Sequence, residues 1–538
     1  MRSLTKGVLT LVATMPVLFA QVEPKVTAAS PSSEIAIRVD AKAQTTPFPH
    51  FWEQTFGSGR AILSLRESYR DDLRAVKKVT DFTAVRFHGI FMDDVGLYNP
   101  DAHTQNPGQA AESVEPGQSV YNFSYIDQIY DGLLANHVRP FVELSFMPKK
   151  LASDLSALQP FWYKPNVSPP KDYKLWDAMI TAFTRHLIDR YGIDEVAKWD
   201  FEVWNEPNLD FWAGKPAQTT YFEFYDHTAL AVKKVSNRIH IGGPSTAQAA
   251  WIAAFLQHCK QNNIPVDFVS THVYANDTAK DVMGTNEQIP RDRMVCRSVS
   301  KVHDEIAKSP FPDTPLIFSE YNASYANEPD VTDSIYMGPW LASTISQCDG
   351  LTESMSYWSF SDVFEEQGVV RTPFYGGFGL LAEDEIPKPA LNAFAMLHRL
   401  GDRRIAVDSD AALVTTQADG SIVVALWNYA PPYGTGATYT PPPANAGPVK
   451  TVFLKVDSIA PNGSALIWRL DADHGNVIKT FDAMGRPAFP SRDQIARLRL
   501  AGQPSPPQAI TLRDGALKLT IPPQGLVVIK IECDRGTH

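Results

Sequence analysis

The sequence is poor in the features that mark disordered, membrane-spanning or nucleic-acid-binding proteins. Gly (31) and Pro (41) stay below the low-complexity range, and no block of about five like charges occurs in the 538 residues. The net charge of −11 has the wrong sign for a protein that tracks phosphates. After the N-terminus, no run approaches the ~18 apolar residues of a membrane span. With 44% hydrophobic and 20% charged residues, the composition is that of a soluble globular protein.

Signatures of cofactors and metals are also scarce. The four cysteines are scattered, without CxxC or metal-ligand spacing, at Cys259, Cys296, Cys348 and Cys533. No HExxH, GxGxxG or P-loop pattern occurs, and IGGPST (241–246) fits a turn at a strand end better than a phosphate cradle. The sequence therefore predicts neither a cofactor nor a metal. An exported chain permits one or two disulfides, and the sequence leaves their pairing open.

The N-terminal segment 1–29 has the pattern of a secretory signal peptide. Arg2 and Lys6 precede an apolar run from residue 7 to residue 20, which is too short for a membrane span. Cleavage is expected between Ala20 and the small residues at 28–30. The alternative is an apolar N-terminus that packs on the folded domain. We expect an exported protein, periplasmic or secreted, that is not inserted in a membrane once the signal is removed.

Residues 48–388 alternate short β-type runs with helix-length segments, which is typical of crossover units around a parallel sheet. Between residues 176 and 188 the apolar side chains recur every three or four positions, and Gly192 follows as a stop. Eight β-type runs occur: HFWEQTFG (50–57), FTAVRFHG (82–89), RPFVELSF (139–146), KWDFEVWNE (198–206), HIGGPS (240–245), VDFVSTHVY (266–274), PLIFSEYN (315–322) and MSYWSFSD (355–362). The pattern predicts a (β/α)₈ TIM barrel.

Residues 389–538 have a different texture. Short alternating or β-branched runs are separated by Gly, Pro, Asp and Asn, with little helical period except near 492–499. This favours an appended antiparallel β-sandwich, and the run at 34–40 in the segment 30–47 is expected to join it as an N-terminal strand. The sandwich could bind polysaccharide, but no row of aromatic residues stands out, so we interpret it as a structural buttress.

Two glutamates lie at the ends of predicted barrel strands. Active-site residues gather at the carboxyl ends of the strands, where Glu206 ends the fourth run and Glu320 the seventh. Glycoside hydrolysis needs two carboxyl groups that flank the scissile bond, one protonated and one ionised. A lone Glu is more often a surface or ion-paired residue. However, Glu206 ends an apolar strand between Asn205 and Pro207, which is an unusual place for a solvated charge.

Nine collinear segments carry a family resemblance. They are RFHGIFMDDVGLY, YNFSYIDQIYDGLL, RPFVELSFMPKKLAS, SPPKDYKLW, FEVWNEPNLDFW, VDFVSTHVY, IFSEYNASY, SYWSFSDVFEE and GGFGLLAEDEIPKPALNAF. Together they resemble glycoside hydrolase family 39, within the clan of (β/α)₈ retaining glycosidases. MPKKLAS and SDVFEE resemble the bacterial β-xylosidase branch, whereas α-L-iduronidases share the family and the Asn-Glu-Pro signature.

The resemblance assigns roles to individual residues. It implies that Glu206 is the general acid/base and Glu320 the nucleophile of a retaining double displacement. Further substrate-binding residues implied by it are His88, Asn205, His272, Tyr274, Trp358, Glu365 and Glu366. Of the last two, at least one would bind the outer hydroxyls and close the pocket. Without the resemblance, a strand-end His is more often a core residue, and Tyr274 and Trp358 could simply pack inside the barrel.

The resulting hypothesis is an exo-acting β-D-xylosidase that releases xylose from the non-reducing ends of xylo-oligosaccharides. One alternative keeps the mechanism but changes the sugar, to an α-L-arabinoside or an α-L-iduronide. A uronic acid needs a cation at the sugar C5, and Lys149 and Lys150 keep that option open. Another alternative is a non-catalytic sugar-binding barrel, which should have lost one of the two glutamates. The aromatic run at 161–163 either flanks an aglycone subsite or packs a loop.

Overall fold

The computed structural model describes residues 33–100, 120–432, 447–460 and 462–532. The predicted signal peptide and Cys533 lie outside these ranges. Within them, no helix has the length and apolar character needed to cross a lipid bilayer. A disulfide joins Cys296 to Cys348, and Cys259 is a buried free thiol.

Parallel strands close into a barrel, which confirms the predicted (β/α)₈ fold. Its strands follow the eight predicted runs. In barrel order they are β3 (Thr55–Arg60), β4 (Ala84–His88), β5 (Arg139–Glu143), β6 (Asp200–Glu202), β7 (His240–Thr246), β8 (Phe268–Tyr274), β9 (Leu316–Asn322) and β10 (Ser354–Tyr357). Both faces of these strands are buried, which explains why they appear in the sequence as continuous apolar runs.

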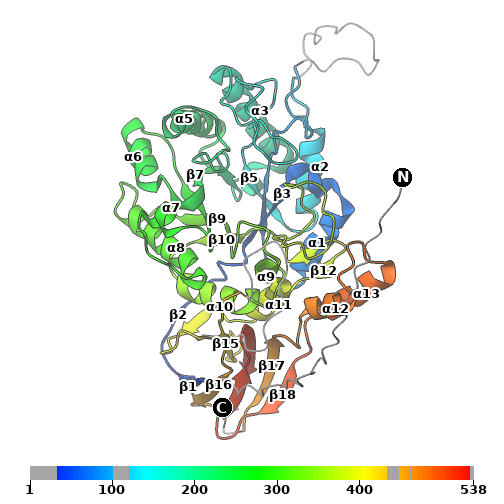
Figure 1. The fold of residues 1–538 in the computed structure, drawn as a ribbon. Coiled ribbons are helices and arrows are strands. Elements are labelled where there is room, and N and C mark those ends of the chain that lie inside the picture. Colours follow the sequence, from blue (N-terminus) through cyan, green and yellow to red (C-terminus); the bar gives the residue numbers. More distant parts are fainter. Residues whose placement is uncertain (1–32, 101–119, 433–446, 461, 533–538) are drawn as a thin grey trace, which may run out of the picture.

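Helices cover the outside of the barrel (Figure 1). In α3 the Asp172 side chain accepts from the Lys174 amide at the N-terminus, and Gly192, at φ 80°, ends the helix as predicted. The helical elements of this region are η1 (Ala61–Leu65), α1 (Glu67–Lys77), α2 (Ser124–Leu134), α3 (Tyr173–Tyr191), α4 (Ile193–Val196), α5 (Ala217–Val235), η2 (Ala247–Ala249), α6 (Ile252–Asn262), α7 (Ala279–Met283), α8 (Arg291–Ala307), α9 (Pro329–Thr332) and α10 (Met337–Cys348).

Most of the remaining strands form a two-layer sandwich. The larger sheet has the order β18-β17-β20-β15-β14-β13-β2, and the smaller has the order β1-β16-β19. Their bounds are β1 (Ser33–Asp40), β2 (Thr45–Pro47), β13 (Arg403–Ile405), β14 (Ala412–Thr416), β15 (Ile422–Asn428), β16 (Lys450–Asp457), β17 (Ser464–Leu470), β18 (Gln508–Thr511), β19 (Ala516–Ile521) and β20 (Gly525–Ile531). The expected antiparallel arrangement fails at one pair, because β1 runs parallel to β16. The whole barrel separates these two strands in the chain, so no hairpin dictates their direction.

The larger sheet faces the sandwich core on one side and the barrel on the other. In β15, Ile422, Val424 and Leu426 pack with the smaller sheet, whereas Val423 and Trp427 belong to the core that continues into the barrel. Figure 1 shows α10 and α11 (Pro389–Leu397) between the barrel and the sandwich strands, and both helices contact the larger sheet. This two-sided burial makes the sandwich a firm support for the barrel.

A small helical layer interrupts the sandwich region. The helices α12 (Val477–Ala483) and α13 (Arg492–Ala501) separate β17 from β18, and α13 covers the segment with predicted helical period. Ser491 and Gln494 form a capping box at the start of α13. The two helices pack on a short ribbon of β11 (Leu381–Ala382) and β12 (Ile386–Pro387), at the side of the molecule (Figure 1).

Candidate active site

A pocket of about 280 Å³ opens at the carboxyl ends of the barrel strands. It collects most of the predicted site residues, from strands that are far apart in the sequence. Those that line it are His88, Asn205, Glu206, Tyr274, Glu320, Trp358 and Glu366, and Gln159, Phe161, Leu209, Phe211, Ala247, Gln248, Asp277, Tyr325, Gln367 and Phe378 complete the wall. The fold therefore gathers these side chains around one small volume, as the strand-end argument predicts.

Arg86, on β4, is the centre of the polar network beneath the pocket and was not singled out by the sequence. Its guanidinium is completely buried. It donates from Nε to Glu202 (2.6 Å), from Nη1 to Glu320 (2.7 Å) and from Nη2 to Asn205 Oδ1 (2.9 Å). Glu143 lies 2.8 Å from Nη2. Burial opposes the charge, but the attraction of the carboxylates raises the pKa of Arg86, so the network contains a permanent cation.

A sequence signal for this network exists. Arg86 and His88 are two positions apart in an otherwise apolar strand, so both point to the same face. Glu143 and Glu202 likewise interrupt apolar strands. Charged residues are rarely buried unless they are paired. Four of them in neighbouring barrel strands therefore indicate an internal ion network.

Glu320, on β9, is held by donors at both carboxylate oxygens. Arg86 Nη1 donates to Oε1, and the hydroxyl of Tyr274 donates to Oε2 at 2.7 Å. The Glu320 side chain is 5% exposed, so its remaining accessible face opens to the pocket. The two donors fix the orientation of the carboxylate. This leaves the carboxylate facing the pocket.

Glu206 follows β6 on a strained turn. Both Trp204 (φ 76°) and Glu206 (φ 45°) adopt left-handed backbone conformations that are uncommon for residues with side chains. The turn is held because the Glu206 amide donates to the Ser245 carbonyl (2.7 Å), and the Trp204 indole donates to the Phe211 carbonyl (2.6 Å). Burial raises the pKa of Glu206 to about 7, against the pull of the nearby cationic groups. Near neutral pH this side chain can therefore both give and take a proton.

His272, on β8, connects the two glutamates. Its Nε2 lies 3.4 Å from Arg86 Nη2, which can only donate, so Nε2 accepts and the proton resides on Nδ1. Nδ1 then donates to Glu206 Oε1 at 3.0 Å. Burial lowers the pKa of His272 to about 4, so the ring is neutral at ordinary pH. One oxygen of Glu206 and one of Glu320 lie within 4.8 Å of each other and of His272.

His88 lies between an inner and an outer carboxyl group. Nδ1 is 2.8 Å from Glu143 Oε2, and Nε2 faces Glu366 at 3.6 Å and Glu320 at 3.9 Å. Burial opposes protonation, but the attraction of Glu143 raises the pKa of His88. Burial also raises the pKa of Glu366 to about 8. The pair offers both donors and acceptors to hydroxyl groups in the pocket.

The structure separates several residues that the sequence placed together. Glu365 does not line the pocket, because its oxygens accept from Arg60 (2.9 Å) and Arg66 (2.6 Å) on the outer side of the loop. The loop turns at Glu366, where the Gly368 amide donates to the Glu365 carbonyl at 3.2 Å, and of the two glutamates only Glu366 lines the pocket. Of the aromatic run, Phe161 lines the pocket, whereas the Trp162 side chain is exposed.

Lys149 also lies away from the pocket. Its ammonium group is 3.9 Å from Asp93, and the side chain is largely exposed. Across the described ranges, the pocket wall contains neither Lys nor Arg. Asp277, which the sequence did not single out, adds a fourth carboxyl group to the wall. Burial raises the pKa of Asp277 to about 7.

The sequence and the structure both resemble known glycoside hydrolases. The profile of the family described as glycosyl hydrolases family 39 matches residues 35–516. A β-xylosidase of Geobacillus stearothermophilus is 38% identical over 482 residues, which are 88% of this chain and 90% of the relative. An α-L-iduronidase of Mus musculus is 23% identical over 435 residues, which are 72% of this chain and 64% of the relative. The crystal structure of a monomeric β-xylosidase from Caulobacter crescentus matches with a TM-score of 0.79 and 30% identity, covering 93% of this chain and 99% of that one.

Proposed function

Because the chain belongs to glycosyl hydrolase family 39, we propose that it is an exo-acting retaining β-D-xylosidase. The substrate is a xylo-oligosaccharide, from which xylose is released at the non-reducing end. The observation that carries the proposal is the pair Glu206 and Glu320, whose oxygens approach within 4.8 Å across a small pocket. Retaining glycosidases hold their carboxyl groups about 5–5.5 Å apart, whereas inverting enzymes leave room for a water.

In the first step, a Glu320 oxygen attacks the anomeric carbon. The bond from that carbon to the leaving oxygen breaks, and Glu206 transfers its proton to that oxygen. A pKa of about 7 keeps much of Glu206 protonated at neutral pH, as this step requires. The products are a glycosyl ester on Glu320, a shortened oligosaccharide and an ionised Glu206.

In the second step, Glu206 takes a proton from a water molecule. The hydroxide oxygen bonds to the anomeric carbon, and the ester bond to Glu320 breaks. Xylose leaves with its original configuration, and both carboxyl groups return to their starting states. Arg86 and Tyr274 stabilise the Glu320 carboxylate as it is released.

The other pocket residues act on the sugar itself. Asn205 accepts from Arg86 through Oδ1, which leaves its amide NH₂ to donate to the 2-hydroxyl, a contact that strengthens in the transition state. His88 and Glu366 bind hydroxyls farther from the anomeric carbon. Trp358 supplies an apolar face for the ring. Glu365 has no sugar contact in this proposal and instead fixes the loop that carries Glu366.

The charge of the pocket favours a neutral pentose over a uronic acid. Four carboxyl groups line it, and its described wall offers neither Lys nor Arg to a uronate. A carboxylate on C5 would therefore find no lysine or arginine in the described wall to pair with, which disfavours its burial there. The pocket therefore does not suit a uronide, although the chain is 23% identical to the α-L-iduronidase of Mus musculus.

The test is a set of initial rates on aryl glycosides: β-D-xyloside, α-L-arabinopyranoside, β-D-glucoside and α-L-iduronide. Each is measured beside the Glu320→Ala variant, with and without azide. We expect the β-xyloside to dominate, and azide to rescue the variant with formation of an α-xylosyl azide. Turnover of a different sugar would refute the xyloside assignment but keep the mechanism. Inactivity on every substrate would favour a non-catalytic sugar-binding protein.

We also propose that the chain is exported. The basic start and apolar run of residues 1–29 support this, and so does the disulfide between Cys296 and Cys348, since such bonds persist in oxidising compartments. Mature protein recovered from the periplasm or medium should begin between residues 21 and 31. Recovery of an intact N-terminus, only in the cytoplasmic fraction, would contradict export.

A further inference from the structure

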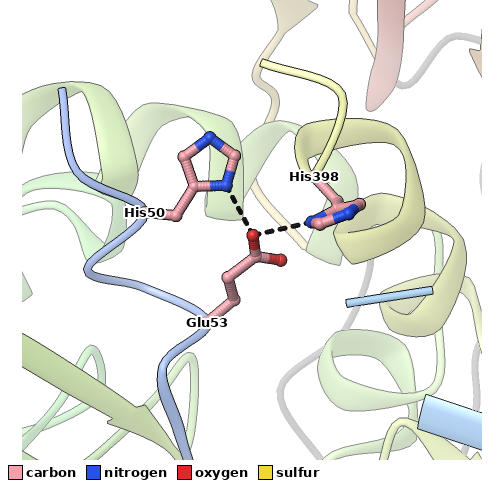
Figure 2. Close-up of side chains that lie close together, drawn as sticks. All are labelled: His50, Glu53 and His398. Atoms are coloured by element: carbon pink, nitrogen blue, oxygen red, sulfur yellow. Dashed lines mark hydrogen bonds and ion pairs between the residues drawn. The ribbon is translucent and has the colours of Figure 1, made fainter. Parts of the chain in front are cut away.

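A second group of histidine and carboxylate side chains lies at the opposite end of the barrel. Figure 2 shows the rings of His50 and His398 pointing to the same carboxylate oxygen of Glu53. His50 and Glu53 precede β3, and His398 follows α11 in the link to the sandwich. The group therefore joins the amino-terminal end of the barrel to the start of the second domain. We refer to these three residues as the basal cluster.

Glu53 is a buried carboxylate whose second oxygen is unsatisfied. The residue is 2% exposed. Its Oε1 lies 2.5 Å from His50 Nδ1 and 2.8 Å from His398 Nδ1. Its Oε2 is buried and has no hydrogen-bond partner in the part of the chain that the structure describes. A buried carboxylate with an unsatisfied oxygen is costly unless a cation or donor binds it.

The outer nitrogens of the two rings both face acceptors. His50 Nε2 is 3.1 Å from the Leu400 carbonyl, which can only accept, so Nε2 carries a proton. A neutral His50 then directs the lone pair of Nδ1 at the Glu53 carboxylate, which is repulsive unless a cation lies between them. His398 Nε2 faces the Asp81 carboxylate at 3.8 Å. Metal-binding histidines commonly have this arrangement, with the outer N–H held by a carbonyl or carboxylate.

The surroundings supply an acidic cavity and no fixed cation. A cavity of about 440 Å³ adjoins the cluster, and Glu53, Asp81 and Asp402 are among its lining residues. Its wall, within the described ranges, includes neither Lys nor Arg. Arg399 is next to His398 in the chain, but its guanidinium stacks on Trp468 at 4.2 Å. Within the described residues, only protonation of the two histidines or a bound cation can therefore balance the charge of the Glu53 carboxylate.

We propose that the basal cluster binds a divalent transition-metal ion of the zinc class through His50 Nδ1, His398 Nδ1 and Glu53. Imidazole and carboxylate ligands suit zinc, and water from the cavity can complete a tetrahedral site. Ligand atoms about 2.0–2.1 Å from zinc lie roughly 3.3 Å apart. Each ring nitrogen, now 2.5 or 2.8 Å from Glu53 Oε1, must therefore move less than about 1 Å farther from that oxygen, and the two histidine side chains are 25% and 32% exposed.

The proposed ion has a structural role that is independent of sugar hydrolysis. It ties the segment before β3 to the link after α11, at the junction of the two domains. None of its three ligands lines the sugar pocket. Binding displaces any proton shared between the rings and Glu53, so affinity should fall in acid.

The first measurement is a calorimetric titration of the full chain with Zn²⁺, after removal of any purification tag and dialysis against a chelator. We expect one binding site. Glu53→Gln and, as a milder change, His398→Gln should each weaken binding at least about 100-fold. The matched control is His258→Gln, because His258 contacts Asp226 at 2.8 Å without a second histidine and lies outside the basal cluster. The control should bind zinc as tightly as the parent chain.

Two further readouts separate a specific site from surface binding. Zn²⁺ should raise the Tm of the parent and of His258→Gln, but not of the two basal variants. Co²⁺ should give visible absorption bands in the parent that the basal variants lack. Absence of binding in the parent, or equal affinity in all variants, would overturn the proposal. So would nitrogen NMR showing both rings doubly protonated near neutral pH, unchanged by Zn²⁺.

Discussion

Two contacts between a histidine and a glutamate look alike and differ in where the proton lies. At the mouth of the barrel, His272 Nδ1 is 3.0 Å from Glu206 Oε1, and at the base His50 Nδ1 is 2.5 Å from Glu53 Oε1. Arg86 donates to the far side of His272, which leaves the proton on Nδ1. The Leu400 carbonyl accepts on the far side of His50, which places the proton on Nε2.

The partner of the outer ring nitrogen therefore decides what such a pair can do. At the mouth, a fixed arginine supplies the positive charge, and the histidine is a neutral donor that orients an acid. At the base, no arginine among the described residues lines the cavity beside the carboxylate, so the same residue types are left to share an exchangeable cation. The first arrangement suits proton transfer, and the second suits metal binding.

The largest effect should come from removing the fixed cation at the mouth. Arg86→Leu leaves Glu143, Glu202 and Glu320 buried together without their shared partner. Loss of one member of a buried ion network typically costs about 3–5 kcal/mol of unfolding free energy. Hydrolysis should be abolished as well, because Glu320 loses a donor. Urea unfolding followed by circular dichroism measures the first effect, and initial rates measure the second.

A surface arginine provides the control for Arg86. Arg190 pairs with Asp127 and Asp131 on exposed helices, and Arg190→Leu should cost less than about 1 kcal/mol. Arg86→Lys retains a charge but cannot reach all five acceptors, so its loss of stability should fall between those of Arg86→Leu and Arg190→Leu. Unfolding of Arg86→Leu at the same urea concentration as the parent would show that the network does not stabilise the fold.

The barrel was predictable because its strands are buried on both faces. Such strands appear in the sequence as short continuous apolar runs, and each of the eight runs overlaps an observed strand. The parallel pairing of β1 with β16 was not predictable in the same way. Its partner lies more than 400 residues away, and local pattern carries no information about which strand will be adjacent.

The two glutamates of the site were predictable from strand ends and from the family resemblance, but their supporting network was not. Arg86 and Glu320 are separated by 234 positions, and a single sequence does not show that they pair. The basal cluster was missed for the same reason, since His398 is 345 positions from Glu53. The sequence also could not show which of Glu365 and Glu366 lines the pocket. That depends on the ion pair between Glu365 and Arg60, whose partners are 305 positions apart.

A change within β3 tests whether the two ends of the barrel are independent. A Cβ on Gly57 would lie 2.1 Å from Trp358 Cε3, so Gly57→Ala must displace the aromatic wall of the pocket. A displacement of about 1 Å at such a site can cost about 100-fold in rate. We therefore expect kcat/KM on an aryl β-xyloside to fall by about 10–100-fold. Zinc binding at the base should be unchanged.

Gly463→Ala is the control for Gly57. A Cβ there would meet its nearest neighbour at 3.5 Å, an ordinary contact, and the position is remote from the pocket wall. Its kcat/KM should equal that of the parent. Unaltered kinetics in Gly57→Ala would show that the added methyl group does not displace Trp358 enough to affect the pocket.

A smaller effect is expected in the pH dependence of hydrolysis. Glu206 must be protonated to act as an acid, so kcat/KM should fall as the pH rises above about 7. The His272 N–H donates to the ionised form of Glu206 and thereby lowers its pKa. In His272→Phe the pKa should rise, and the alkaline limb should move up by as much as about one pH unit. The control is His258→Phe, whose pH profile should equal that of the parent. If the alkaline limb of the kcat/KM profile did not move in His272→Phe, the donor role of His272 would be contradicted.

The smallest effect should follow replacement of Lys149, which lies in the loop after β5. Lys149→Ala removes a cation that is 62% exposed and 3.9 Å from Asp93, outside the pocket wall. Exposed ion pairs contribute little, so kcat/KM on the β-xyloside should change by less than about twofold. Because Arg86 is the cation that organises the mouth, no loss specific to a uronide should appear either. A selective loss on the α-L-iduronide would show that Lys149 reaches the substrate and would reopen the uronic-acid alternative.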